Sequence, residues 1–214
     1  MKVSVLFSGG KDSSLSALLL EPFFEVELVT CNFGLLPTGE IAAKTAAELH
    51  FPHRTLSLDR EILEKAYELL QRDGFPKSAI NYIHERAVET LALDPAVKLI
   101  ADGTRRDDRV PVLSISQIRS IEDRFGVQYF CPLKGYGKKV VDSLVGYYLS
   151  IEQGPSESTQ KADYETELRE LVRQRQGEEK IRQLFPVHFQ SHVLSRKKFS
   201  LKKEENVFKN WKPS

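Results

Sequence analysis

The chain has 214 residues, of which 41% are hydrophobic and 29% charged, and its length predicts one core domain with room for an extension. Its 31 basic and 30 acidic residues nearly cancel, which excludes an overall field that would attract nucleic acid. The cysteines are Cys31 and Cys131 alone, which excludes a disulfide framework or a zinc finger and fits a reducing compartment.

The first apolar run is too short for a signal peptide, and no apolar stretch approaches the roughly 20 residues of a membrane helix. We therefore expect a soluble, cytoplasmic protein without a membrane partner.

Short apolar runs alternate with segments of helical period along the first 150 residues. In chain order, strands are predicted over residues 3–7, 26–33, 54–58, 97–101 and 127–131. Helices are predicted after the first strand through Leu19, from Thr38, over residues 59–72, through residues 80–91, and over residues 116–125 and 140–148. This alternation predicts an α/β fold, with a parallel sheet covered by helices on both faces.

Gly154-Pro155-Ser156 marks the end of this unit and divides the chain into a domain over residues 1–153 and an extension over residues 154–214. In the extension we expect a charged helix at about residues 162–176 and a strand over residues 187–194. His188 and His192 could bind a metal if they lay on a helix, but the alternating pattern around them favours a surface strand.

The last twenty residues have seven Lys or Arg against Glu204 and Glu205, a net charge of +5. Such a segment is either a solvated end or an arm that binds RNA.

The segment between the first strand and the first helix is Ser8-Gly9-Gly10-Lys11-Asp12-Ser13-Ser14. Two glycines permit a tight turn and let a ligand approach the backbone closely. The free N–H groups and the positive end of the helix dipole face that ligand, which predicts an anion site. Ser8, Ser13 and Ser14 add hydroxyl donors and Lys11 adds a cation, whereas Asp12 fits only if Mg²⁺ bridges it to phosphate.

This loop is neither a Walker A motif nor a Gly-x-Gly-x-x-Gly fingerprint. Instead, Ser8-Gly9-Gly10-Lys11-Asp12-Ser13 resembles at every position the signature of the PP-loop superfamily, the N-type ATP pyrophosphatases. The superfamily includes synthetases of GMP, NAD, asparagine and argininosuccinate, and several tRNA-modifying enzymes. The resemblance covers about residues 1–150, and it implies a doubly wound five-stranded sheet in the order 3-2-1-4-5 and the use of ATP and Mg²⁺.

A second motif, Gly103-Thr104-Arg105-Arg106-Asp107-Asp108, follows the fourth strand. Its spacing resembles the Gly-His-x-x-Asp-Asp of tRNA-thiolating members, with Thr104 in place of His. In the order 3-2-1-4-5 both motifs lie at the switch point, where open α/β sheets bind ligands. The resemblance implies that Gly103 and Thr104 contact the nucleotide, and that Asp12 holds Mg²⁺ with Asp107 or Asp108. Alternatively, the two aspartates form a solvated pair that caps a helix.

The resemblance also implies that the end of the second strand, with Asn32 and Phe33, lines the adenine pocket through backbone groups, although Phe33 equally fits the core. Cys131 begins Cys131-Pro132-Leu133-Lys134, where several members have a basic residue before Pro-Leu. A thiol there could carry sulfur or attack an adenylate if a cation lowered its pKa. The alternative for Cys131, and for Cys31, is a small buried hydrophobe.

The chemistry implied is that of an ATP-dependent adenylating enzyme. A substrate oxygen attacks the α-phosphorus, pyrophosphate leaves, and nitrogen or sulfur then displaces AMP. Lys11, Asp12, Asp107 and Cys131 are the candidate catalytic residues.

Three functions remain open. The first is tRNA modification, with tRNA bound through the basic tail and with a sulfur or ammonia donor protein as a further partner. The second is a small-molecule amide ligase that uses ammonia. The third is a non-catalytic ATP-binding subunit. The acidic residues of the two motifs argue against it, because binding alone does not require a site for a metal and pyrophosphate.

Overall fold

The computed structural model describes residues 1–155 and 162–197. Its main sheet has five parallel strands in the order β3-β2-β1-β4-β5, which confirms the predicted fold class. These strands are β1 (Lys2–Leu6), β2 (Glu25–Asn32), β3 (His53–Ser57), β4 (Leu99–Ala101) and β5 (Gln128–Phe130). The helices between them are α1 (Lys11–Leu20), α2 (Thr38–Glu48), α3 (Arg60–Asp73), α4 (Lys77–Ala92) and α5 (Ile115–Phe125), and α6 (Lys138–Tyr148) follows β5.

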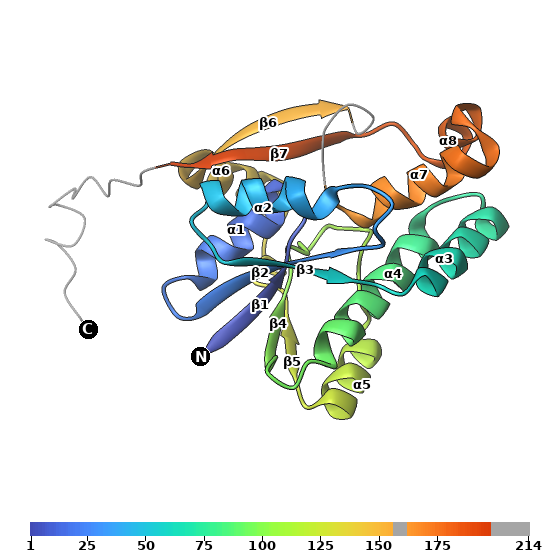
Figure 1. Cartoon of the computed structure of the whole chain (residues 1–214). Coiled ribbons are helices and arrows are strands. Elements are labelled where there is room, and N and C mark those ends of the chain that lie inside the picture. The colour runs from blue at the N-terminus through green and yellow to red at the C-terminus, as the bar shows by residue number, and fades with distance from the viewer. Residues whose placement is uncertain (156–161, 198–214) are drawn as a thin grey trace, which may run out of the picture.

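The sheet separates two hydrophobic clusters, because successive side chains of a strand point to opposite faces. On one face, Val3 and Val5 of β1 pack with α1, α2 and α6. On the other face, Leu6 packs with α3, α4 and α5. Figure 1 shows the two groups of helices on either side of the strands. The near-continuous apolar runs of the central strands are thus buried from both sides.

Local signals define several helix ends. Asp59 precedes α3, and its carboxylate accepts a hydrogen bond from Glu61 N at 2.9 Å. Ser114 and Gln117 form a capping box at the start of α5. Such caps satisfy amide groups that have no partner within the helix. None of the helices in the described part of the chain is long and apolar enough to cross a membrane.

The extension forms a second layer on the main sheet. It consists of β6 (Leu149–Pro155), α7 (Tyr164–Gln176), α8 (Glu178–Leu184) and β7 (Phe189–Arg196), and β6 pairs antiparallel with β7. The helix expected at about residues 162–176 and the strand expected over residues 187–194 are therefore confirmed, with small shifts of their ends. Residue 153, where we divided the chain, lies within β6.

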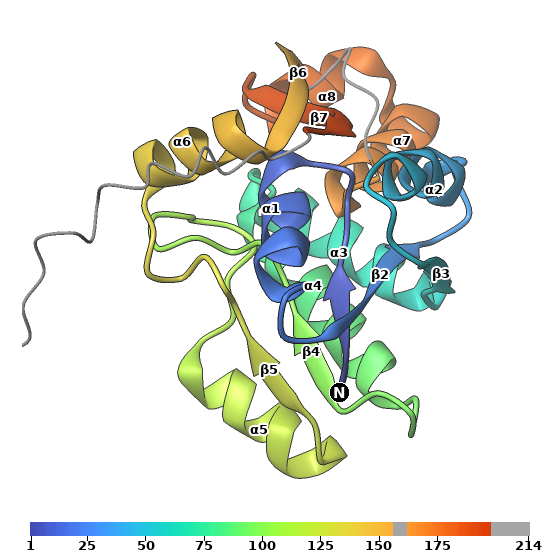
Figure 2. The ribbon, with the colours of Figure 1, turned by 90° about the vertical axis from the view of Figure 1, so that its left-hand side faces the viewer.

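The extension packs onto the carboxyl end of β1. Figure 2 shows β6, β7 and α8 above the tip of the β1 arrow, on the side away from the N-terminus. Val193 of β7 belongs to the same hydrophobic cluster as Val3 and Val5, and Leu168 of α7 belongs to the cluster on the opposite face. The basic tail beyond Lys197 lies outside the described residues.

Candidate nucleotide site

The loop after β1 has the conformation that its glycines allow. Gly9 has φ +75°, in the left-handed region that favours glycine, and Gly10 precedes α1 in an extended conformation. Gly10 has no side chain that could cap this N-terminus, while Ser13 and Ser14 direct their hydroxyls back to Gly10 O at 3.2 and 2.9 Å. The start of α1 therefore has the character of an anion site.

The two motifs predicted to meet are in direct contact. A Cβ atom at Gly103 would lie 2.5 Å from Ser13 N and 2.7 Å from the Asp12 carbonyl carbon. On the preceding residue, Asp102 O accepts a hydrogen bond from Ser16 Oγ at 2.9 Å. Only glycine lets the end of β4 approach α1 this closely, which explains the residue type at position 103.

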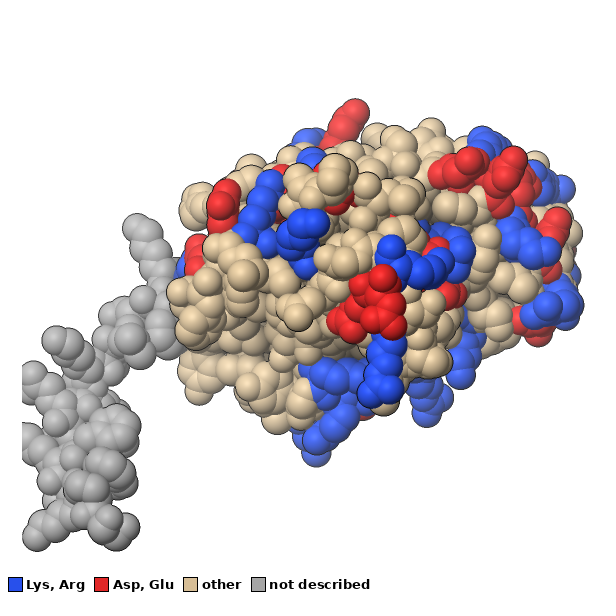
Figure 3. All heavy atoms as spheres, turned by 90° about the horizontal axis from the view of Figure 1, so that it is seen from below, with Lys and Arg blue, Asp and Glu red and all other residues tan. Residues whose placement is uncertain are grey.

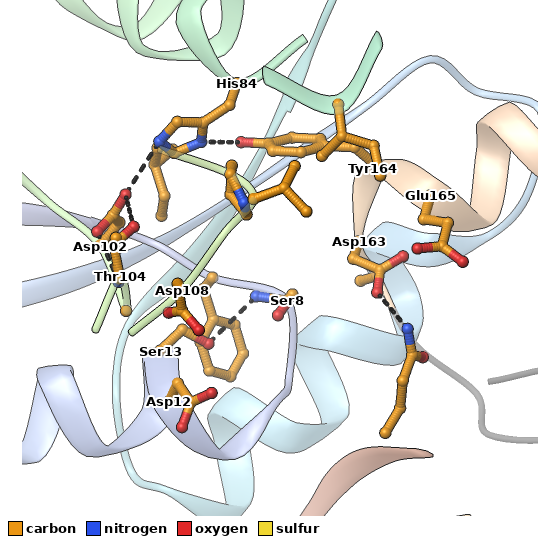
Figure 4. A pocket seen from close by; sticks show the side chains of 18 of the residues that line it. Ser8, Asp12, Ser13, His84, Asp102, Thr104, Asp108, Asp163, Tyr164 and Glu165 are labelled. Carbon is orange, nitrogen blue, oxygen red and sulfur yellow. Dashed lines mark hydrogen bonds and ion pairs between the residues drawn. The ribbon is translucent and has the colours of Figure 1, made fainter. Parts of the chain in front are cut away.

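A cavity of about 480 Å³ opens above this contact. The loop contributes Ser8, Asp12 and Ser13 to its wall, the second motif contributes Gly103, Thr104, Arg105 and Asp108, and the extension contributes Asp163, Tyr164 and Glu165. Figure 4 shows the side chains of Ser8, Asp12, Ser13, Thr104 and Asp108 around one space with those of Asp163, Tyr164 and Glu165. Residues from three separate parts of the chain therefore form one chamber.

Arg105 lies among the carboxylates predicted to hold a metal. Its Nε atom is 3.8 Å from Asp12 Oδ2 and 3.8 Å from Asp107 Oδ1, and its guanidinium pairs with Asp108. Asp108 Oδ2 also accepts a hydrogen bond from Arg105 N at 2.7 Å. The guanidinium thus neutralises a group of acids that would otherwise repel one another.

Asp107 differs from the other two acids, because it caps a helix. Its Oδ2 accepts a hydrogen bond from Lys138 N at 2.8 Å, at the start of α6, and this bond lowers the pKa of Asp107. That is the alternative we stated for the acidic pair, whereas Asp12 and Asp108 face the cavity.

Lys11 is held between two carboxylates. Its Nζ atom lies 2.5 Å from Asp12 Oδ1 and 3.3 Å from Asp142 Oδ1 of α6, and its side chain is only 9% exposed. The described residues contain no group of three or more His, Cys, Asp or Glu arranged to hold a metal ion. The donors nevertheless fit Mg²⁺, because this ion commonly takes one or two carboxylates and completes its shell with phosphate oxygens and water.

Asn32 and Phe33 are outside the set of described residues that line the cavity, which reaches β2 through Val29 and Cys31 instead. The Phe33 amide donates to Glu167 Oε2 at 2.8 Å, and the Phe33 ring packs on the core. A role of these two residues in adenine binding stays a prediction.

The surroundings of Cys131 do not activate its thiol. The Sγ atom donates to the Tyr129 hydroxyl at 3.6 Å, and burial together with the charge of Asp102 raises the pKa of Cys131 to about 12. A nucleophilic or sulfur-carrying thiol requires the opposite shift. Burial likewise raises the pKa of Cys31 to about 12, which fits the buried-hydrophobe alternative.

The extension holds the loop through backbone atoms, and the sequence did not reveal this. Ala162 N donates to Ser8 O at 3.2 Å, and Val193 N donates to Gly9 O at 3.1 Å. Lys11 N in turn donates to Ser191 Oγ at 3.3 Å. The loop is therefore supported on the side that faces β7.

Glu167 of α7 supports a second loop. It is 1% exposed, and its carboxylate accepts hydrogen bonds from Phe33 N and Leu35 N, both at 2.8 Å, and from Leu36 N at 3.4 Å. In the sequence, Glu167 looked like one of several acids in a charged helix. Its role depends on a loop that lies more than a hundred positions earlier.

A family of unknown function, DUF7411, matches residues 1–195. The chain belongs to this family. An uncharacterized protein of Methanocaldococcus jannaschii, MJ0690, is 43% identical over 199 residues, which is 92% of this chain and 98% of the relative. A crystal structure from the same organism, of a protein described as a predicted subunit of tRNA methyltransferase, has a TM-score of 0.84 at 41% identity, and it covers 94% of this chain and 100% of that one.

A more distant similarity covers only part of the chain. The tRNA-specific 2-thiouridylase MnmA of Syntrophomonas wolfei is 34% identical over 99 residues, which is 46% of this chain but 25% of the thiouridylase. Together with the strand order, this similarity supports the resemblance to the PP-loop superfamily.

Proposed function

We propose that this chain binds ATP at residues 8–13 and cleaves it to AMP and pyrophosphate, so that an oxygen atom of a substrate is adenylated for attack by sulfur or nitrogen. The main support is the contact of Gly103 with the start of α1, which unites the two motifs at the floor of one cavity. A cavity at the carboxyl ends of β1 and β4 is where a doubly wound sheet binds its ligands.

Each part of the site has a task in this reaction. The amides at the start of α1 and the hydroxyls of Ser8 and Ser13 bind the phosphates. Asp12 and Asp108 would hold Mg²⁺, which neutralises charge on the departing pyrophosphate. Arg105, already beside both carboxylates, adds positive charge at the same place.

We further propose that the substrate is a tRNA. The basic tail supports this proposal, as do the names of two relatives, a thiouridylase specific for tRNA and a predicted subunit of a tRNA methyltransferase. On the face shown in Figure 3, basic and acidic side chains are interspersed. We assign the phosphate contacts to the tail because of its net charge of +5, and most of the tail lies outside the described residues.

A second candidate is a subunit that binds ATP without cleaving it. It is favoured by the ion pairs that Arg105 forms with the acids of the site, and by the description of the similar crystal structure as a subunit. Labelled ATP, incubated with Mg²⁺ and an unfractionated tRNA pool, distinguishes the candidates. AMP and pyrophosphate support the enzyme, ATP that is bound but intact supports the subunit, and ADP as the main product contradicts both.

Asp12→Asn should lower ATP cleavage on the order of 10²-fold, as the loss of a preorganised electrostatic group commonly does. Asp107→Asn is the matched control, since Asp107 caps α6, and it should have a much smaller effect.

For tRNA, a chain that ends after Lys197 keeps the contacts of β7 with the other described residues, including Arg196 with Glu21 and Lys197 N with Tyr148 O. It should bind ATP normally but lose salt-dependent affinity for tRNA, whose slope is about −0.7 to −0.9 per phosphate contact. Unchanged tRNA affinity of the shortened chain would show that the tail does not bind tRNA. Pyrophosphate release with ammonia and a small acid, without RNA, would identify the amide ligase.

A further inference from the structure

Four polar side chains lie together beside the cavity, and three of them form part of its wall. His84 comes from α4, Asp102 from the end of β4, Tyr129 from β5 and Tyr164 from the start of α7. His84 is 2% exposed and Asp102 is 3% exposed, yet His84, Asp102 and Tyr164 all line the cavity. In Figure 4 they form a row above Ser13 and Asp12.

The hydrogen bonds of this set define the protonation of the imidazole. His84 Nε2 lies 3.0 Å from Asp102 Oδ2, and His84 Nδ1 lies 3.5 Å from the Tyr164 hydroxyl. Because a carboxylate accepts hydrogen bonds, the proton belongs on Nε2 and the lone pair of Nδ1 faces Tyr164. This order of carboxylate, imidazole and hydroxyl is the arrangement by which a histidine is oriented to accept a proton.

Asp102 is kept as a carboxylate. Burial alone would raise its pKa, but hydrogen bonds from His84, from the Tyr129 hydroxyl and from Thr104 N together hold the pKa of Asp102 well below its usual range. Thr104 N donates to Oδ1 at 2.9 Å and Thr104 Oγ1 donates to Oδ2 at 3.0 Å. A buried anion with this many donors is able to stabilise an imidazolium beside it.

Tyr164 is kept as a neutral hydroxyl. Burial raises the pKa of Tyr164 well above its ordinary value, and the negative charges of Asp102 and Asp163 add to this shift. A phenol in this state is not itself a base, but it passes a proton to an acceptor on its other side. Cys131 is further away, since it donates to Tyr129 and not to His84.

The set is linked to the loop that binds the phosphates. Asp102 directly precedes Gly103, which lies against Ser13 N, and Asp102 O is bonded to Ser16 of α1. Polar residues with only a structural role do not need to reach the cavity, whereas a residue that accepts a proton from a substrate must reach it.

We propose that His84 is the general base of this site and acts through Tyr164, with Asp102 as its positioning residue. This inference rests on the proposed function. The nucleophile carries a proton on nitrogen or sulfur. As its bond to the adenylated carbon forms, the bond from that carbon to the AMP oxygen breaks and AMP leaves with the electron pair. The proton moves to the Tyr164 oxygen while the Tyr164 proton moves to His84 Nδ1.

The first test is independent of ATP chemistry. Long-range ¹H–¹⁵N spectra of the full chain, with His84 assigned by its loss in His84→Gln, should show Nε2 protonated and Nδ1 bare. Tyr164→Phe should shift the Nδ1 resonance, whereas Tyr82→Phe, at a position of α4 that does not line the cavity, should leave it in place. A proton on Nδ1 would overturn the proposal, because the lone pair would then face Asp102.

The second test measures AMP formation from ATP against pH, with the tRNA pool and with ammonia or hydrosulfide as the nucleophile, whose concentration is kept the same at every pH. His84→Gln should lower the rate on the order of 10²–10⁴-fold and should abolish the pH dependence of the wild type. Imidazole should restore activity to His84→Gly, in proportion to the neutral imidazole present. Tyr82→Phe, which removes a phenol hydroxyl from α4 at a position that does not line the cavity, is the matched control and should keep the wild-type pH profile.

The two ways of failing are distinguishable. A His84→Gln protein that cleaves ATP with the wild-type pH profile would refute the base and leave the proposed function standing. Absence of AMP from the wild type with every acceptor would refute the proposed function and the base together.

Discussion

Hydrogen bonds within the loop after β1 join residues that are close in the sequence. Hydrogen bonds between the loops of the main domain and the extension join residues that are far apart in the sequence. Within the loop, Ser14 bonds to Gly10 four positions away. Between the loop and the extension, Lys11 N bonds to Ser191 across 180 positions, and Glu167 reaches Phe33 across 134. The conformation of the loop is therefore specified locally, while its support comes from distant parts of the chain.

This difference shows that the extension is part of the proposed nucleotide site. Ala162 and Val193 donate hydrogen bonds to the backbone of the loop after β1. Tyr164 lines the cavity, and Glu167 accepts hydrogen bonds from the loop after β2. A sequence motif identifies the surface that faces the ligand, but it does not reveal what holds that surface in place.

The largest effect should come from the contact between the two motifs. A methyl group in Gly103→Ala would lie 2.5 Å from Ser13 N, so the backbone must shift. We expect a loss of about 1–3 kcal/mol in the free energy of unfolding, and a fall in ATP affinity on the order of 10²-fold as the loop moves. Urea denaturation and equilibrium binding of ATP measure the two quantities.

Gly146→Ala is the control for that variant. Gly146 lies inside α6 with nothing within 4 Å of a Cβ atom, so alanine should raise stability by up to about 1 kcal/mol without changing ATP affinity. Equal effects of the two substitutions would contradict the close contact at Gly103.

A smaller effect on ATP affinity is expected from a change in Glu167, through which the extension holds the loop after β2. Glu167→Ala leaves the amides of Phe33, Leu35 and Leu36 without their acceptor, and a buried unsatisfied group costs about 1–3 kcal/mol. Stability should fall, and ATP affinity should fall less than in Gly103→Ala. Glu179→Ala, at an exposed position of α8, is the control and should stay within about 0.5 kcal/mol of the wild type. Unchanged stability of the Glu167 variant would show that this carboxylate is dispensable.

The smallest effect should come from Cys131→Ala, which we expect to leave ATP cleavage within about twofold, as for a residue that only packs. Because the pKa of the thiol is about 12 and not near 8.5, its thiolate fraction at pH 8 is lower by on the order of 10³. Alkylation by iodoacetamide, followed by mass spectrometry, should be correspondingly slow in the folded chain. Rapid labelling of Cys131, or loss of activity in the variant, would restore it as a candidate nucleophile.

Much of the fold was predictable because burial on both faces leaves a clear mark on the sequence. The apolar run over residues 3–7 became β1 over Lys2–Leu6, and the run over residues 26–33 became β2 over Glu25–Asn32. β6 was missed because Leu149 is its one buried residue, and because Gly154 and Pro155 at its end are typical of a turn.

The candidate site was predictable where the residues are neighbours in the sequence, as in residues 8–14, or follow a recognisable strand, as Gly103 does. His84 gave no local signal, since it lies inside α4 with the spacing of an ordinary core residue. Glu167 gave none either, because a charged helix has many acids and only the fold shows which of them is buried. Asp107 could be assigned to the cap of α6 only when the start of that helix was known.

The hydrogen bond between Lys11 N and Ser191 Oγ has a consequence for how the protein is made. A ribosome adds about 5–20 residues per second, so roughly 9–36 s pass between the synthesis of the two partners. During that interval the nascent chain already carries the whole motif of residues 8–13, but not the strand that supports it. ATP binding by the emerging polypeptide should therefore begin only after β7 has left the exit tunnel.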